Sequence, residues 1–194
     1  MAKKKEKLPP LSKDGSIHVT DEVINTVTHM TGAVFSLLGM VLLIVFSAAD
    51  GKPWQLISFS IYGLSLLLLF LASSLHHGLN ISPKINETFR LFDYLAIFIL
   101  IAGTYTPLCL VISRTTWGWS IFGVVWAVAI IGIIIKSVFP AIPKWVTHTL
   151  YISMGWVGVI LIIRSISLIG ATGFALLLAG GIVYTVGAAV YYFE

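Results

Sequence analysis

Charged residues are scarce in this chain, and their scarcity excludes an ordinary soluble domain. Of the 194 residues, 10% are charged and 58% are hydrophobic, and the mean hydropathy is +0.98. Soluble domains carry about 25% charged residues, because part of every fold must face its solvent. Lipid is the solvent that fits this composition.

Cysteine is nearly absent as well. The single cysteine, Cys109, lies inside an apolar run, which excludes a disulfide framework. The chain also lacks a basic stripe interleaved with aromatic residues or any other nucleic-acid-binding motif. We therefore expect no nucleic-acid partner. The lysines that gather in the first 22 residues favour a membrane-surface or orienting role instead.

Six apolar runs dominate the rest of the sequence. Each is close to the roughly 20 residues that cross a bilayer as a helix, and none alternates as barrel strands do. We predict an all-α integral membrane protein with a basic cytoplasmic tail over 1–22, a single transmembrane domain over 23–194, and a polar connection over 76–90. The six predicted spans cover about 23–49, 56–75, 91–112, 119–138, 145–163 and 171–193.

The distribution of lysine and arginine predicts the orientation. With six spans, nine of the 12 basic residues fall in the tail and the even-numbered connections, and three fall in the others. Basic residues are enriched in cytoplasmic connections. We therefore expect a multi-pass protein of the cell membrane with both chain ends in the cytoplasm. The three on the other side are Lys52, Arg114 and Arg164.

Tryptophans and small residues suggest how the spans are anchored and packed. Tryptophans at span ends are predicted as interfacial anchors, and two deeper ones are predicted to pack between helices. Pairs of small residues at short spacing are predicted to let helices approach closely. The anchors are Trp54, Trp117, Trp119 and Trp145, the packing residues Trp126 and Trp156, and the pairs Gly155 with Gly158 and Gly181 with Thr185.

Among the ionisable residues within the spans or at their ends, four matter for function: His29, His77, Asp93 and His148. Such residues are costly in a bilayer and are functional-site hypotheses by default. The first, third and fifth spans rise from the cytoplasmic side, and the second descends to it. All four residues are therefore predicted at a similar depth near the inner face.

The residue types in this layer are typical of a metal site. Ser73 and His77 are four residues apart and share one helix face. A histidine binds metal through one ring nitrogen, and a nearby hydroxyl or carboxylate can orient it. Asp93 could hold a metal-bound water and act as its base.

Each of these residues also has an explanation without a ligand. His29 and His148 could be interfacial residues satisfied by water or backbone, and His76 is expected to point away from His77 toward the loop or lipid headgroups. Asp93 could cap the third helix, and Ser73 could bond to the preceding turn. One histidine and one aspartate fall short of the three or four protein ligands of a zinc site.

Several of these motifs resemble those of one protein family. Residues 73–77 (SSLHH) resemble the Ser-x-x-x-His motif that ends the second helix of the hemolysin III group, the bacterial branch of the progestin and adiponectin receptor family. Residues 93–107 (DYLAIFILIAGTYTP) are similar to its third helix and residues 25–32 (NTVTHMTG) to its first. Residues 151–158 and 180–184 resemble its fifth and sixth helices.

The resemblance implies a seven-helix bundle with a cytoplasmic N-terminus and a zinc ion near the cytoplasmic face. It implies His77 as a zinc ligand, Asp93 as the holder of a metal-bound water, and Ser73 beside them. The family's other two ligands belong to a His-x-x-x-His motif in the seventh helix, and these 194 residues contain no such motif. The six spans would then be six of seven, and His29 and His148 are the further candidate ligands.

Three functions are compatible with this site. The first is a zinc-dependent amide or ester hydrolase of a membrane lipid, acting in membrane lipid homeostasis, since the family is similar to ceramidase-like proteins. The second is a non-enzymatic sensor of lipid state with a structural zinc. The third is a pore-forming cytolysin, which the family's name implies. Membrane lipids are the expected partners in each case.

Overall fold

A computed structural model describes residues 19–193 of the chain. The helices are α1 (Val19–Ala49), α2 (Pro53–Gly78), α3 (Pro83–Pro107), α4 (Thr116–Val138) and α5 (Lys144–Phe193), and a short π-helical turn, η1 (Leu108–Ile112), follows α3. No strand occurs among these residues, so the all-α prediction is confirmed. The lysines of the predicted tail lie outside the described residues.

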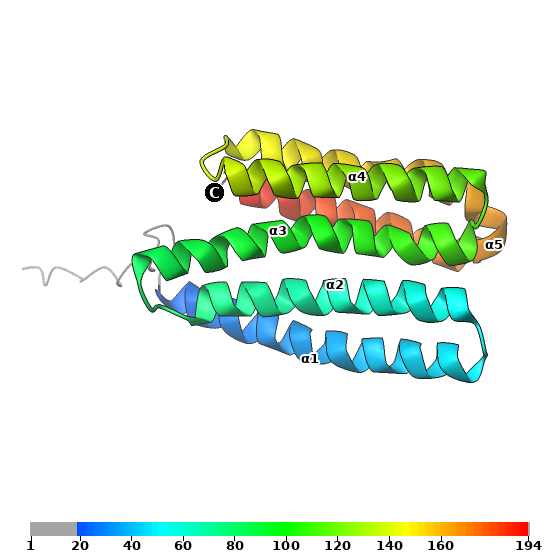
Figure 1. The fold of residues 1–194 in the computed structure, drawn as a ribbon, viewed down its shortest axis with the longest axis horizontal. Coiled ribbons are helices and arrows are strands. Elements are labelled where there is room, and N and C mark those ends of the chain that lie inside the picture. The colour runs from blue at the N-terminus through cyan, green and yellow to red at the C-terminus, as the bar shows by residue number, and fades with distance from the viewer. Residues whose placement is uncertain (1–18, 194) are drawn as a thin grey trace, which may run out of the picture.

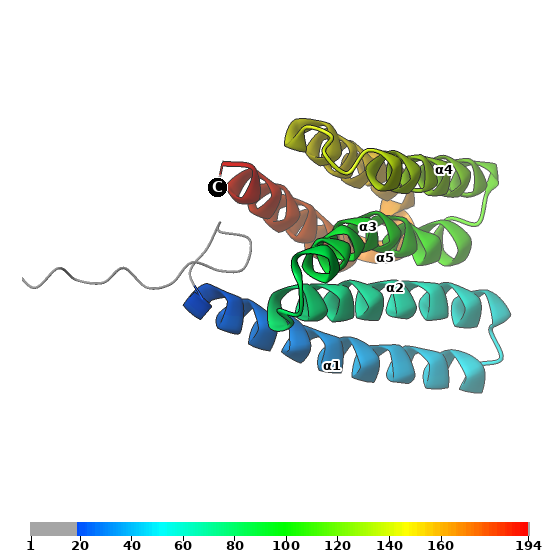
Figure 2. The ribbon, with the colours of Figure 1, turned by 60° about the vertical axis from the view of Figure 1, so that its left-hand side comes forward.

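The helices run roughly antiparallel to one another in a bundle (Figure 1). α1 packs on α2, and α3 lies centrally, in contact with α2, α4 and α5. Seen from a second direction, α1 and α2 form one edge of the bundle, and α4 lies on the far side of α3 (Figure 2). The connections between α2 and α3 and between α4 and α5 lie at one end, together with the start of α1 and the C-terminus (Figure 1).

Within residues 19–193, five segments are long and apolar enough to cross a membrane: Glu22–Ala49, Pro53–Gly78, Pro83–Ile112, Thr116–Val138 and Ile166–Val190. They correspond to five of the six predicted spans. The remaining run, 145–163, is helical as the first part of α5 but is not among these five segments. Gly170 interrupts α5 with φ 67° and ψ 173°, a conformation open to glycine because it has no Cβ. The chain folds back at this point (Figure 1).

Helix ends differ from the predicted span ends, and the polar connection predicted over 76–90 is wrong. Only residues 79–82 separate α2 from α3. The Ser82 side chain accepts a hydrogen bond from the backbone of Ile85, and Pro83 opens α3. Hydropathy marks where a helix enters lipid, whereas caps and prolines mark where it begins. Both helices therefore extend beyond their apolar runs.

The packed core lies where α3 meets α4 and α5. It contains Phe98, Ala102, Val125 and Met154, each at most 2% exposed. The Tyr105 hydroxyl lies 2.6 Å from the carbonyl oxygen of Met154 and joins α3 to α5. These contacts hold α3 rigidly against its neighbours.

The predicted packing of small residues and deep tryptophans is confirmed only in part. A Cβ on Gly158 would lie 2.7 Å from the Tyr105 hydroxyl, so this glycine permits the close approach of α3, whereas a Cβ on Gly181 would meet nothing within 4 Å. Trp126 packs against the core. Trp156 is 43% exposed, and its indole nitrogen donates to the Thr185 hydroxyl at 3.2 Å.

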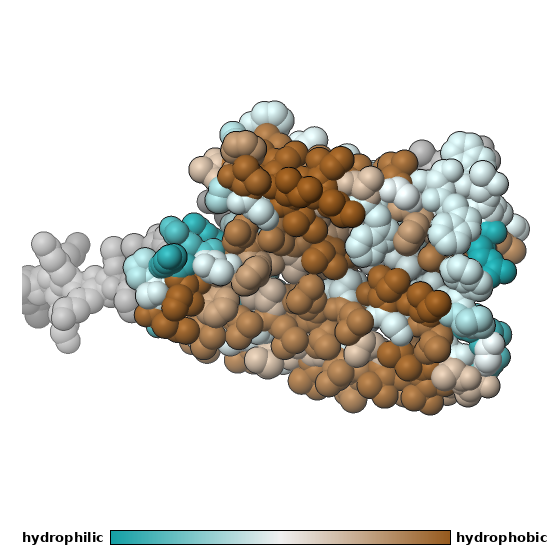
Figure 3. Space-filling view, in the orientation of Figure 1, coloured by the Kyte–Doolittle hydropathy of each residue, from teal (hydrophilic) through white to brown (hydrophobic). Residues whose placement is uncertain are grey.

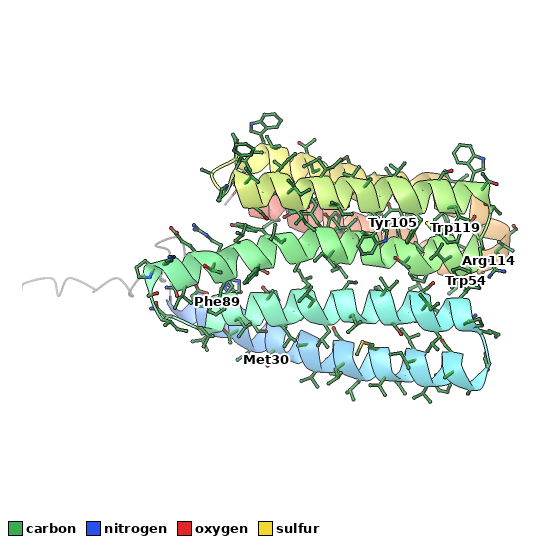
Figure 4. All side chains as sticks on the ribbon, in the orientation of Figure 1. Met30, Trp54, Phe89, Tyr105, Arg114 and Trp119 are labelled. Carbon is green, nitrogen blue, oxygen red and sulfur yellow. The ribbon has the colours of Figure 1, made fainter. Side chains whose placement is uncertain are left out.

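The surface is apolar along the middle of the bundle and polar at both ends (Figure 3). Trp54, Arg114 and Trp119 gather at the end opposite Phe89 (Figure 4). The Trp54 and Trp119 rings pack edge to face at 5.7 Å, and the Arg114 guanidinium lies 5.3 Å above the Trp54 ring. An apolar belt between aromatic and charged ends is the surface expected of a membrane-spanning bundle.

Candidate metal centre

The last turn of α2 meets the N-terminal parts of α1 and α3 at one end of the bundle. His76 and His77 lie in the last turn of α2. Asp93 lies almost three turns inside α3, which begins at Pro83. Phe89 of α3 lies at this end of the molecule (Figure 4). Asp93 is therefore too far from the first turn to cap α3, and that alternative is wrong.

Three side chains with metal-binding atoms come together here. One ring nitrogen from each of His76 and His77 and a carboxylate oxygen of Asp93 all lie within 4.8 Å of one another. His76 is buried, and His77 and Asp93 are half-buried. Imidazole and carboxylate are common zinc donors, and catalytic zinc sites use three protein ligands. The donor set therefore fits zinc in chemistry, and it reaches three ligands only if Asp93 binds the ion directly.

The position of His76 corrects an expectation. Its ring lies 4.7 Å from that of His77, and only 7% of the residue is exposed. Because it neighbours His77 in sequence, the sequence predicts that it points toward the loop or headgroups. The helix continues to Gly78, so both histidines remain on it and both reach the space beside Asp93.

Ser73 supports the carboxylate of this group. Its side chain hydrogen-bonds that of Asp93, and the residue is 4% exposed. The adjacent Ser74 instead donates to the carbonyl oxygen of Phe70, one turn earlier, at 2.7 Å. The two serines thus have different roles: Ser73 orients Asp93, and Ser74 bonds to its own helix.

Glu22 completes the cluster from α1. Its carboxylate oxygen Oε2 lies 2.6 Å from Nδ1 of His77, and the Glu22 and His77 side chains are 10% and 17% exposed. The other oxygen, Oε1, is buried without a hydrogen-bond partner. A metal-binding histidine commonly donates its second ring nitrogen to a carboxylate, and Glu22 occupies that position.

The two further candidate ligands differ in position. The His29 ring stacks on that of His77 at 5.6 Å, and its Nδ1 is buried without a hydrogen-bond partner. His148 lies on α5, with Nδ1 2.7 Å from the carbonyl oxygen of Lys144 and its ring 6.3 Å from that of Tyr151. Neither belongs to the group formed by His76, His77 and Asp93.

Sequence reasoning missed Glu22 and misjudged His76. The sequence places Glu22 in the polar tail, because the apolar run begins after it. A signal was present, however: Glu22 and His29 are seven residues apart and therefore lie on one helix face. The start of α1 at Val19 places Glu22 inside that helix.

An open cavity of about 650 Å³ lies at the other end of the bundle, lined by residues of the α1–α2 turn and of the segment 110–115. Lys52 and Arg114 line it, but no histidine or carboxylate does. The groups that could carry out metal chemistry therefore lie at the opposite end.

Comparisons with known proteins agree with the motifs. The family model described as "Haemolysin-III related" matches residues 17–194. The chain is 38% identical over 176 residues to Hemolysin-3 of Bacillus cereus, covering 91% of this chain and 80% of that protein. It is 36% identical over 173 residues to the Hemolysin-3 homolog of Bacillus subtilis (strain 168), covering 89% and 81%. No solved structure matches the chain.

Proposed function

This chain belongs to the haemolysin-III-related family, and on that basis we propose that it is a zinc-dependent hydrolase of membrane lipids that serves membrane lipid homeostasis. The observation that carries the proposal is the meeting of His76, His77 and Asp93, with their donor atoms within 4.8 Å of one another. Ionisable groups are costly beside lipid, so three of them converging at one point indicates a site.

The proposed orientation places this site near the cytoplasmic face of the cell membrane. We propose six crossings, with the two parts of α5 on either side of Gly170 as the fifth and sixth. The grouping of the α2–α3 and α4–α5 connections with the start of α1 supports this arrangement (Figure 1). The excess of lysine and arginine on that side then follows the positive-inside pattern.

Each side chain of the site has a distinct role in the proposed reaction. His76 and His77 would hold the metal, and a bound zinc ion would supply Lewis-acid chemistry, polarising a lipid carbonyl and lowering the pKa of water to about 7. The Asp93 carboxylate accepts a proton from the attacking water and passes it to the leaving amine or alcohol. The Ser73 hydroxyl keeps that carboxylate in place.

The proposed substrates are membrane lipids with an amide or ester bond near the headgroup. The site lies at one end of the bundle, and the surface between the two polar ends is apolar (Figure 3). A lipid whose acyl chains follow that surface would bring its headgroup linkage to the depth of Asp93. Water, the second reactant, is available at the same depth.

Lipid hydrolysis by the purified full-length chain with zinc tests the proposal. Ceramide and phospholipid substrates in detergent micelles should be cleaved by the wild type. Asp93→Asn should lower the rate by about 100-fold or more, the range of a general base. Asp50→Asn is the control, because Asp50 is exposed and pairs with Lys52 outside the cluster. No hydrolysis by zinc-loaded wild type would contradict the enzymatic proposal and favour a lipid sensor with structural zinc.

Cytolysis is a second candidate, favoured by the names of the two relatives, Hemolysin-3 and its homolog. A pore needs a polar path through the bundle. Dye release from liposomes that contain the inserted protein tests it. Release above that of protein-free liposomes would support cytolysis, and none from well-inserted protein would exclude it.

A further inference from the structure

The contact between Glu22 and His77 joins residues that are 55 positions apart. It links the first turn of α1 to the last turn of α2. Both side chains are largely buried, at 10% and 17% exposure, so water competes little for the bond. A buried carboxylate without a partner is strongly unfavourable, which makes this contact a specific one.

The bond determines which nitrogen of His77 carries hydrogen. A carboxylate accepts hydrogen bonds and does not donate when ionised. Nδ1 of His77, 2.6 Å from Glu22 Oε2, must therefore carry the hydrogen. In the neutral ring the other nitrogen, Nε2, then keeps its lone pair, and only a nitrogen with a lone pair can bind a metal.

We propose that Glu22 is a positioning residue that fixes the ring orientation and tautomer of His77, so that Nε2 is the donor atom of the site. This rests on the proposed function, in which His77 holds the metal. His29, whose ring stacks on one face of the His77 ring at 5.6 Å, limits rotation of that ring. Glu22 thus acts through His77, without touching the substrate.

The tautomer is measurable in the metal-free protein. Histidine labelled with ¹⁵N gives separate signals for the two ring nitrogens, and His77→Gln identifies the His77 signals among those of the five histidines. In the neutral state of the ring, the wild type should show Nδ1 protonated. Glu22→Ala should shift His77 toward the Nε2-protonated form, and Glu22→Gln, which keeps an accepting oxygen, should retain Nδ1 protonation.

Zinc affinity provides the second measurement. Loss of an outer carboxylate usually weakens metal binding by about 10–100-fold, so Glu22→Ala should weaken zinc binding by that factor and Glu22→Gln by less. Glu87→Ala is the control, because Glu87 is an exposed acidic residue of α3. It should change neither the tautomer nor the affinity.

The two measurements separate this inference from the proposed function. If the wild type binds no zinc, the metal site is contradicted. If His77 nevertheless loses Nδ1 protonation in the Glu22→Ala variant, the positioning role of Glu22 is supported. A His77 tautomer and zinc affinity unchanged in Glu22→Ala, even with a lower melting temperature, would overturn the inference. If Glu22→Ala does not fold, Glu22→Asp, with its shorter reach, takes its place under the same criteria.

Discussion

Ser73 and Ser74 are neighbours in α2 with different partners, and this difference permits a test at the scale of single residues. The Ser73 side chain bonds that of Asp93, whereas Ser74 bonds the carbonyl oxygen of Phe70. A hydrogen bond to a charged group contributes about 1.5–3 kcal/mol, so we expect Ser73→Ala to lower the hydrolysis rate by about 10–100-fold.

Ser74→Ala should leave the rate nearly unchanged, since that bond lies within one helix. Initial rates at saturating lipid, measured for both variants after confirming equal zinc content, check this prediction. Equal losses in the two variants would mean that Ser73 has no specific role at Asp93.

Also at the residue scale, the sequence predicts the site residues that interrupt an apolar run, and it misses the site residues that lie at the ends of such a run. His77 and Asp93 stand out because a charge within an apolar run is unusual. Glu22 lies just before its run and resembles an ordinary helix-start residue, and His76 was discounted because it adjoins His77. Which of these side chains meet depends on the packing of α1 and α3 against α2, which no local pattern contains.

At the scale of elements, α3 and α4 approach closely at one glycine. A Cβ on Gly132 of α4 would collide with the ring of Phe98, whereas one on Gly123 of the same helix would meet nothing within 4 Å. Phe98 is 1% exposed and packs against Tyr151 at 4.6 Å, so its ring has no room to move.

We therefore expect Gly132→Ala to reduce stability by about 1–3 kcal/mol, the usual cost of overpacking. Gly123→Ala should be neutral or stabilising by up to about 1 kcal/mol, because alanine favours helix. Unfolding of both variants in the same detergent, followed by circular dichroism, measures the difference. A Gly132→Ala variant as stable as Gly123→Ala would contradict the packing of α4 on Phe98.

The helices themselves were largely predictable, and their ends were not. Apolar length alone located five segments able to span the membrane. The ends depend on local chemistry, such as Pro53 at the start of α2 and the Ser82 cap of α3. The fold-back at Gly170 depends on one backbone conformation, which hydropathy does not report.

At the scale of the whole molecule, the proposed topology makes opposite predictions for its two ends. Three exposed positions serve as cysteine substitutions: Asp50→Cys, Asn80→Cys and Ala171→Cys. Cys109 is fully buried and should not react. In intact cells, a membrane-impermeant maleimide should label positions 50 and 171, and position 80 only after permeabilisation.

Labelling of Asn80→Cys in intact cells would show that the orientation is opposite to the one proposed. Protection of Ala171→Cys, with Asp50→Cys labelled, would show that the first part of α5 does not cross the membrane. The same experiment thus tests the number of crossings and the side on which the histidine cluster lies.

Elemental analysis of the purified full-length chain measures directly whether the cluster of His76, His77 and Asp93 holds a metal. We expect about one zinc ion per chain in the wild type and in Asp50→Asn, and far less than one in His77→Ala. A wild type without zinc after purification in zinc-containing buffer, or a His77→Ala variant that retains the wild-type content, would contradict a metal centre at His77.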